Sequence, residues 1–216
     1  IYSQSRGGLL EFLATAGVYL LKRFKWTGVI VGGVLAAPMM LLGGRGGKAA
    51  EGSTLERLEC WQAGIMMFQS SPAIGVGYGQ YTQHHFLTAH NSYVLAFAET
   101  GAIGVTLWTT AMYMTTKIVL AGATGLEGEA AEIARIWGLA LLSAFVGMLT
   151  GILLLSFAYH PVLWIYCALV GAYYVSVKRH APDWKVELTA RDLAYLVAIN
   201  AVLFIGIFVY VKLKVG

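Results

Sequence analysis

The chain has 216 residues, of which 58% are hydrophobic and only 12% charged, and its mean hydropathy is +0.68. A soluble domain carries about 25% charged residues, so this composition excludes a disordered chain, a nucleic-acid-binding domain and a disulfide scaffold. The net charge of +4 and the pI near 9.0 do not indicate nucleic acid, because lysine and arginine collect in the cytoplasmic loops of membrane proteins. The two cysteines, Cys60 and Cys167, are isolated and not expected to form a disulfide.

Apolar stretches recur along the whole chain and predict membrane-spanning helices. A hydrocarbon core about 30 Å thick requires roughly 17–25 helical residues. We therefore expect an all-α polytopic bundle that forms a single membrane domain over residues 1–216. Because the chain opens with Ile1 rather than Met, we expect it to be the carboxy-terminal part of a larger protein. Six spans are predicted: 7–22, Trp26–Leu42, Ser92–Thr116, Ile136–Phe157, Val162–Val177 and Leu193–Val211.

The longest stretch between predicted spans, residues 43–90, contains one predicted amphipathic helix over Thr54–Phe68. Ser53 and Glu56 have the spacing of a capping box at its start, and Pro72 follows its end. One apolar stripe recurs at spacings of three and four residues, and consists of Leu58, Trp61, Ile65 and Phe68. We expect this helix to lie at the membrane interface.

The positive charges predict how the chain is oriented. If the loop Lys22–Lys25 is cytoplasmic, nine of the 15 lysines and arginines lie on that side and six on the outer side. Positive charges favour the cytoplasm, so the loop 43–90 is expected outside. Lys212 and Lys214 run against this bias, because the same orientation puts both of them outside.

His90 and Asn91, followed by nine residues and then Gly101-Ala102-Ile103-Gly104, form the stretch with the most chemical information. His90 is expected where the outer loop enters the third span, near water but at the edge of a low-dielectric layer. A histidine there can titrate near neutral pH and take a proton from a hydroxyl. Gly101 and Gly104 are expected to let another helix approach closely. The alternative is a polar helix start with small packing residues.

Upstream, the segment Ser71–Gly79 has glycines at alternate positions, including Gly75 and Gly77. Glycines free the backbone to turn and expose N–H groups, which suits a bound anion. The alternative is a flexible re-entrant turn.

Three arginines, Arg6, Arg45 and Arg57, are expected on the outer side. Arginines can clamp a phosphate or diphosphate through bidentate hydrogen bonds. The alternative for Arg57 is a surface ion pair with Glu56 or Glu59, and for Arg6 it is an anchor that extends its charge to the membrane surface.

Three blocks in order resemble the O-antigen ligase and polymerase family of bacterial membrane glycosyltransferases. The first is Ser5-Arg6-Gly7-Gly8, the second is Arg57-x-x-x-Trp61 leading into Ser71–Gly79, and the third is His90-Asn91-(nine residues)-Gly101-x-x-Gly104. They cover about residues 5–104.

The resemblance implies inverting transfer of a glycan from undecaprenyl diphosphate, without a metal or other cofactor, at the periplasmic face of the inner membrane. The acceptor of a ligase is lipid A-core, and that of a polymerase is a growing glycan. The catalytic histidine of the family falls on His90, and its arginines on Arg6 and Arg57. We expect substrate contacts from these two arginines and from Arg45, Gly75, Gly77 and Asn91.

Other readings stay open. A non-catalytic membrane subunit or a transporter half would have the same composition, and Gly75–Gly79 resembles the filter of a potassium channel, although Gly75 replaces its threonine. His84, His85 and His90 have the spacing of no common metal site. Glu99 is expected on the helix face opposite His90 and about 13 Å deeper, as a packing or pathway residue. Asn200 is expected to make an interhelical hydrogen bond.

Overall fold

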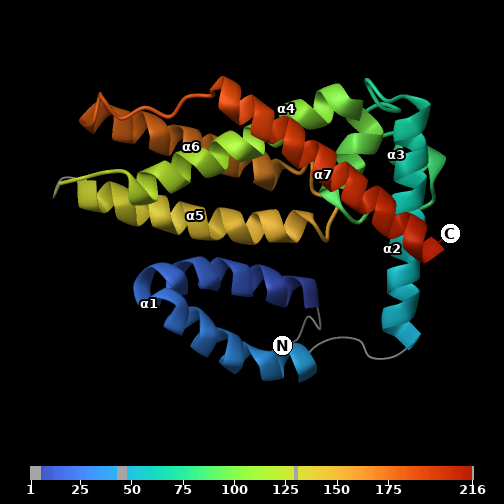
Figure 1. Cartoon of the computed structure of the whole chain (residues 1–216), viewed down its shortest axis with the longest axis horizontal. Coiled ribbons are helices and arrows are strands. Elements are labelled where there is room, and N and C mark those ends of the chain that lie inside the picture. Colours follow the sequence, from blue (N-terminus) through green and yellow to red (C-terminus); the bar gives the residue numbers. More distant parts are fainter. Residues whose placement is uncertain (1–5, 43–47, 129–130, 216) are drawn as a thin grey trace. The chain divides into compact units, whose positions relative to one another are not determined.

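The computed structural model describes residues 6–42, 48–128 and 131–215. Within these ranges every regular element is a helix, which confirms the all-α prediction (Figure 1). The helices are α1 (Arg6–Leu42), α2 (Lys48–Ser70), α3 (Tyr81–His84), α4 (Ser92–Thr124), α5 (Glu132–Ile152), α6 (Pro161–His180) and α7 (Ala190–Val215). Both cysteines are free, as expected.

Four of the helices in the described part of the chain, α4 to α7, are long and apolar enough to cross a membrane, so this is a multi-pass membrane protein. The prediction of six spans is corrected to four. The two predicted spans 7–22 and Trp26–Leu42 both fall in α1, whose backbone leaves the helical region at Lys25 (φ 54°, ψ −150°). The bend leaves two arms of about 19 and 17 residues, which lie at the lower limit of the length that a span requires, and α1 is not among the four helices that meet the criteria for a span. Figure 1 shows the two arms meeting at the bend.

The chain folds into two compact units, which are described separately. Unit 1 comprises residues 1–45, 114–151 and 161–187, and unit 2 comprises residues 46–113, 152–160 and 188–216. Each unit therefore collects segments that are distant in sequence. His90, Arg57 and the glycine-rich segment all belong to unit 2.

Unit 1 packs its helices through small residues. A Cβ atom added to Gly151 on α5 would lie 2.9 Å from Oε1 of Glu11 on α1. One turn earlier, Gly147 faces Thr15 of α1 in the same way. Tyr173 on α6 donates a hydrogen bond to the carbonyl oxygen of Ala134 at 2.8 Å. Small residues are the usual means by which membrane helices approach closely.

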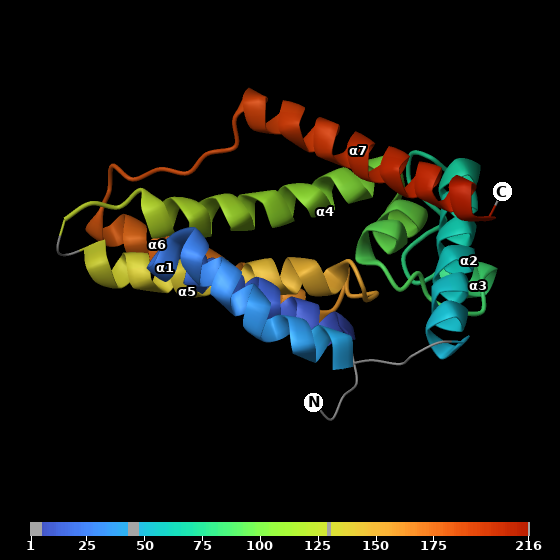
Figure 2. The same ribbon diagram turned by 60° about the horizontal axis from the view of Figure 1, so that its bottom comes forward.

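In unit 2, the carboxy-terminal end of α7 crosses α2 and packs on it, as Figures 1 and 2 both show. Leu58 and Ile65 of α2 form a buried cluster with Val211 of α7, and the Trp61 ring lies 6.0 Å from that of Tyr210. The apolar stripe predicted for this helix is therefore correct, but it packs on protein. The start of the helix was predicted wrongly, because α2 begins at Lys48 and the proposed capping box lies inside it.

The carboxy-terminal end of α7 thus lies at the same end of unit 2 as α2, which agrees with the expected grouping of Lys212 with the loop 43–90. Nearer the middle of α7, Asn200 donates a hydrogen bond from Nδ2 to Oγ1 of Thr109 on α4 at 2.9 Å. This confirms the interhelical hydrogen bond predicted for Asn200.

Candidate functional site

Helix α4 is broken at Gly101, whose backbone has φ 61° and ψ −164°. In an unbroken helix the carbonyl of Ala98 would accept from the N–H of Ala102, and that of Glu99 from the N–H of Ile103. The break separates these four groups, and unpaired backbone groups in a membrane each cost several kcal/mol.

The glycine-rich segment supplies a new partner to each of the four groups. Val76 and Gly77 donate their N–H groups to the carbonyls of Ala98 and Glu99, both at 2.9 Å. The N–H groups of Ala102 and Ile103 donate to the carbonyls of Pro72 and Ala73 at 2.8 and 3.1 Å. The segment 72–77 is therefore built into the broken helix rather than being a flexible turn.

Gly75 and Gly101 allow this backbone-to-backbone approach. A Cβ atom on Gly75 would lie 2.5 Å from the oxygen of Glu99, and one on Gly101 would lie 2.5 Å from the nitrogen of Ile74. Gly101 was expected to admit a second helix, but the structure puts the segment 72–77 there. A Cβ atom on Gly104 would first meet Thr100 of its own helix.

The N–H groups that were expected to bind an anion are used within the protein. Gly75 donates to the carbonyl of Ser71 at 2.9 Å, and Gly77 donates to Glu99. Gly77 also accepts a hydrogen bond from the N–H of Gln80 at 3.2 Å. The structure therefore gives these two glycines the task of holding the break in α4.

His90 stands two residues before the start of α4 and is half-buried. Its backbone is left-handed, with φ 49°, which is uncommon for a residue with a side chain. Asn91 caps the helix, because its Oδ1 accepts from the N–H groups of Tyr93 and Val94 at 2.9 and 3.1 Å. Asn91 is only 4% exposed and has a capping role, while the substrate contact expected of it stays a prediction.

The turn between α5 and α6, residues 153–160, contacts this helix start. The N–H of His90 donates to Oγ of Ser156 at 2.9 Å, and Nδ2 of Asn91 donates to the carbonyl of Leu153 at 3.1 Å. Oγ of Ser92 donates to the carbonyl of Leu155 at 2.7 Å. These contacts explain why α5 ends at Ile152, five residues earlier than predicted.

Arg57 and Trp61 lie one turn apart on α2. Nε1 of Trp61 donates to the carbonyl of Ala89 at 3.0 Å, which ties α2 to the residue before His90. Arg57 is half-buried, and within the described part of the chain it forms no ion pair with Glu56 or Glu59. Its guanidinium is therefore not committed to the surface pair that was the alternative to ligand binding.

Glu99 lies two residues before the break in α4, and its side chain is only 3% exposed. Its Oε1 accepts a hydrogen bond from the N–H of Tyr81 at 2.9 Å, which fixes the start of α3. Among the described residues, neither its Oε2 nor the hydroxyl of Tyr159 has a hydrogen-bond partner.

Tyr159, in the turn after α5, lies close to Glu99. Burial raises the pKa of the Tyr159 phenol, and the nearby Glu99 raises it further. Tyr159 also packs edge-on against Tyr78, with ring centroids 4.8 Å apart.

Two predicted site residues cannot be placed. Arg45 and the side chain of Arg6 lie outside the part of the chain that is described. Arg6 opens α1, which belongs to unit 1.

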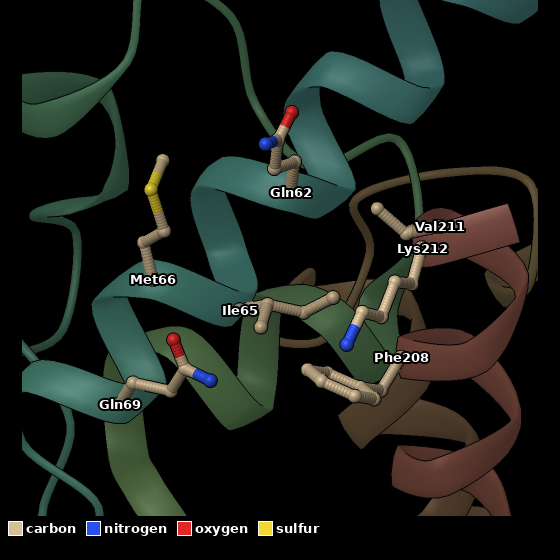
Figure 3. A pocket seen from close by; sticks show the side chains of 7 residues that line it. All are labelled: Gln62, Ile65, Met66, Gln69, Phe208, Val211 and Lys212. Carbon is tan, nitrogen blue, oxygen red and sulfur yellow. The ribbon is translucent and has the colours of Figure 1, made fainter. Parts of the chain in front are cut away.

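A small groove of about 260 Å³ opens between α2 and α7 (Figure 3). Nζ of Lys212 stands above its apolar floor, 5.9 Å from the ring centroid of Phe208. The lining residues are Gln62, Ile65, Met66, Gln69, Phe208, Val211 and Lys212. The groove is thus separate from the residues around His90.

The turn 153–160 was missed as part of the site because no local motif marks Ser156 or Tyr159. One signal was present in the sequence. The charge-based orientation puts this short loop on the same side as the loop 43–90, which makes it a candidate neighbour of His90.

Comparison with known protein families matches residues 1–109 to the family described as O-antigen ligase. No curated protein and no solved structure matched the chain. The matched region includes Arg57, the glycine-rich segment, His90 and the break in α4. The turn 153–160 lies beyond it.

Proposed function

Because the chain belongs to the O-antigen ligase family, we propose that it transfers a glycan from undecaprenyl diphosphate to an acceptor hydroxyl, such as one on lipid A-core. The family is one of ligase- and polymerase-type glycosyltransferases. We place the reaction at the periplasmic face of the bacterial inner membrane. The observation that carries the proposal is a histidine with a left-handed backbone at the entrance of a spanning helix, next to Ala89, whose carbonyl accepts a hydrogen bond from Trp61 on the helix of Arg57.

In this proposal His90 is the general base. A ring nitrogen of its neutral imidazole accepts the proton of the acceptor hydroxyl. The acceptor oxygen attacks the anomeric carbon from the side opposite the diphosphate, and the bond from that carbon to the diphosphate oxygen breaks. The glycan is thereby transferred with inversion, and undecaprenyl diphosphate leaves with the bonding electron pair.

Arg57, with Arg6 by resemblance to the family, holds the diphosphate. Negative charge grows on the leaving oxygen as the bond breaks, and a positioned guanidinium stabilises it. The half-buried setting of Arg57, without a pair to Glu56 or Glu59 in the described part of the chain, leaves its fork of N–H donors for an anionic ligand. Two arginines offset the diphosphate charge that a metal offsets in other transferases, so the proposal needs no metal.

A polymerase of the same superfamily would use the same donor, and differs in taking a growing glycan as acceptor. The two reactions are separated by their products. Purified full-length protein is given an undecaprenyl-diphosphate-linked glycan together with lipid A-core. Transfer to lipid A-core supports a ligase, and longer lipid-linked glycans support a polymerase. With neither product, a non-catalytic role replaces the proposal.

The base is tested by substitution. His90→Ala should lower transfer by about 10²–10⁴-fold, the usual contribution of a positioned acid–base group. His90→Gln should be nearly as inactive, because an amide can form hydrogen bonds but cannot accept the proton. His84→Ala, which changes an exposed histidine on α3, should remain close to wild type. High activity of His90→Gln would show that the residue is a hydrogen-bonding group and that the mechanism is wrong.

A further inference from the structure

We infer that Ser156 is a positioning residue for His90, which means that the turn between α5 and α6 completes the site described above. The inference rests on the proposed function, because it concerns the residue assigned as the base. It extends the site beyond residues 1–109, the region that matches the family. Ser156 follows His90 by 66 residues and belongs to the same unit.

The hydroxyl of Ser156 bridges Thr88 and the backbone nitrogen of His90. It accepts the backbone N–H of His90 at 2.9 Å and donates its own hydrogen to Oγ1 of Thr88 at 3.0 Å. A serine hydroxyl has a single hydrogen to donate, so the second bond fixes the direction in which its lone pairs point. One side chain therefore ties the residue two positions before the histidine to the histidine itself.

The residues that follow His90 hold the same turn. Asn91 donates to the carbonyl of Leu153, and Oγ of Ser92 donates to the carbonyl of Leu155. The hydroxyl of Ser92, which is fully buried, also accepts the N–H of Phe157 at 2.8 Å. With both bonds of Ser156, five hydrogen bonds join residues 88–92 to residues 153–157. These bonds hold the turn against the start of α4 and thereby position the hydroxyl of Ser156.

The backbone of His90 requires such support. A left-handed backbone is disfavoured for a residue with a Cβ atom, and persists where the surroundings over-determine it. The direction of the imidazole depends on that backbone conformation. The bond to Ser156 is made by the peptide nitrogen of His90, beside the φ torsion, so its loss releases the torsion that aims the ring. A displacement of about 1 Å of a catalytic group can reduce a rate about 10²-fold.

The experiment compares three variants of the full-length protein in nanodiscs. Ser156→Ala removes both hydrogen bonds and should lower kcat about 10- to 100-fold, with KM for the lipid-linked donor unchanged because Arg57 is untouched. Ser156→Thr keeps the hydroxyl and should recover most of kcat. Ser70→Ala is the matched control, because the hydroxyl of Ser70 bonds to Met67 of its own helix, and it should behave as wild type.

A second measurement reports on His90 without activity. Diethyl pyrocarbonate modifies accessible imidazoles, and peptide mass spectrometry gives the rate at each histidine. In Ser156→Ala, His90 should react faster than in wild type, relative to the exposed His84 in the same sample. In Ser156→Thr the ratio should return to the wild-type value. Unfolding temperatures of all variants are recorded beside these rates.

The possible failures are distinct. Wild-type kcat in Ser156→Ala, or an unchanged His90 labelling ratio, overturns the inference. Ser156→Thr as inactive as Ser156→Ala also overturns it, because the side chain would then act through packing. If His90→Ala is inactive while Ser156→Ala is fully active, only the inference falls. If His90→Ala keeps its activity, the proposed base is wrong and the positioning role falls with it.

Discussion

Substituting Gly75 tests whether the glycine-rich segment holds the broken helix α4 together. In Gly75→Ala, the new Cβ atom would lie 2.5 Å from the oxygen of Glu99 and from the nitrogen of Thr100. Both atoms belong to the backbone, so neither can rotate away as a side chain would. The segment must therefore move, and the hydrogen bonds from Val76 and Gly77 to the carbonyls of the break are stretched.

Two effects should lower the free energy of unfolding of Gly75→Ala. The backbone of Gly75 is left-handed, with φ +69°, which costs an alanine about 1–2 kcal/mol. Forcing a methyl group into a filled space costs typically about 1–3 kcal/mol. Together they predict that the free energy of unfolding falls by roughly 2–5 kcal/mol.

Gly79 provides a control for the backbone effect alone, because its φ is +73° and a Cβ atom there would meet nothing within 4 Å. Gly79→Ala should lose only about 1–2 kcal/mol.

The measurement is the thermal unfolding of both variants and of wild type, purified in the same detergent. For a chain of this size about 1 kcal/mol shifts the Tm by roughly 2–4 °C, so Gly75→Ala should unfold clearly below Gly79→Ala. Equal Tm values for the two variants would refute the reasoning, since the close approach to Glu99 would then contribute nothing beyond the strained backbone.

Two further predictions concern ligand binding and orientation. Arg57→Lys should lose most of its transfer activity although it keeps the charge, because lysine cannot reproduce a bidentate fork on a diphosphate; near wild-type activity of Arg57→Lys in a transfer assay would argue against this role. In a background lacking Cys60 and Cys167, single cysteines at the exposed positions Thr82 and Asp183 should label oppositely with an impermeant maleimide. Thr82→Cys should react from outside and Asp183→Cys only after permeabilisation, and the opposite pattern would place His90 in the cytoplasm.

Much of the fold could be predicted from hydropathy, because the four spans after residue 90 are long apolar stretches with charged or polar ends. The two segments within α1 show the limit of this criterion. Hydropathy registers how apolar a segment is, and the loop expected at Lys22–Lys25 coincides with the bend at Lys25. The two arms nevertheless lie at the lower limit of the length that a span requires. Periodicity likewise identified the apolar face of α2, but it does not report whether lipid or protein covers that face.

The site was partly predictable for a related reason. The position of His90 at a helix entrance follows from where the apolar span begins, and the role proposed for it follows from its residue type. The roles of Gly75 and Gly101 could not be predicted, because each depends on a backbone segment that is distant in sequence. Glycine spacing alone suggested donors for an anion and a helix contact, whereas the structure uses the glycines to repair a helix. The partner Ser156 has no local signature at all.

The hydrogen bonds between the start of α4 and the following turn also bear on biosynthesis. Leu153 leaves the ribosome 62 residues after Asn91, which at about 5–20 residues per second takes roughly 3–12 s. During this interval His90 has already been translated, but the segment that fixes its backbone has not. The hydrogen bonds that hold the backbone of His90 can therefore form only after α5 has been synthesised, later than the whole family-matched region.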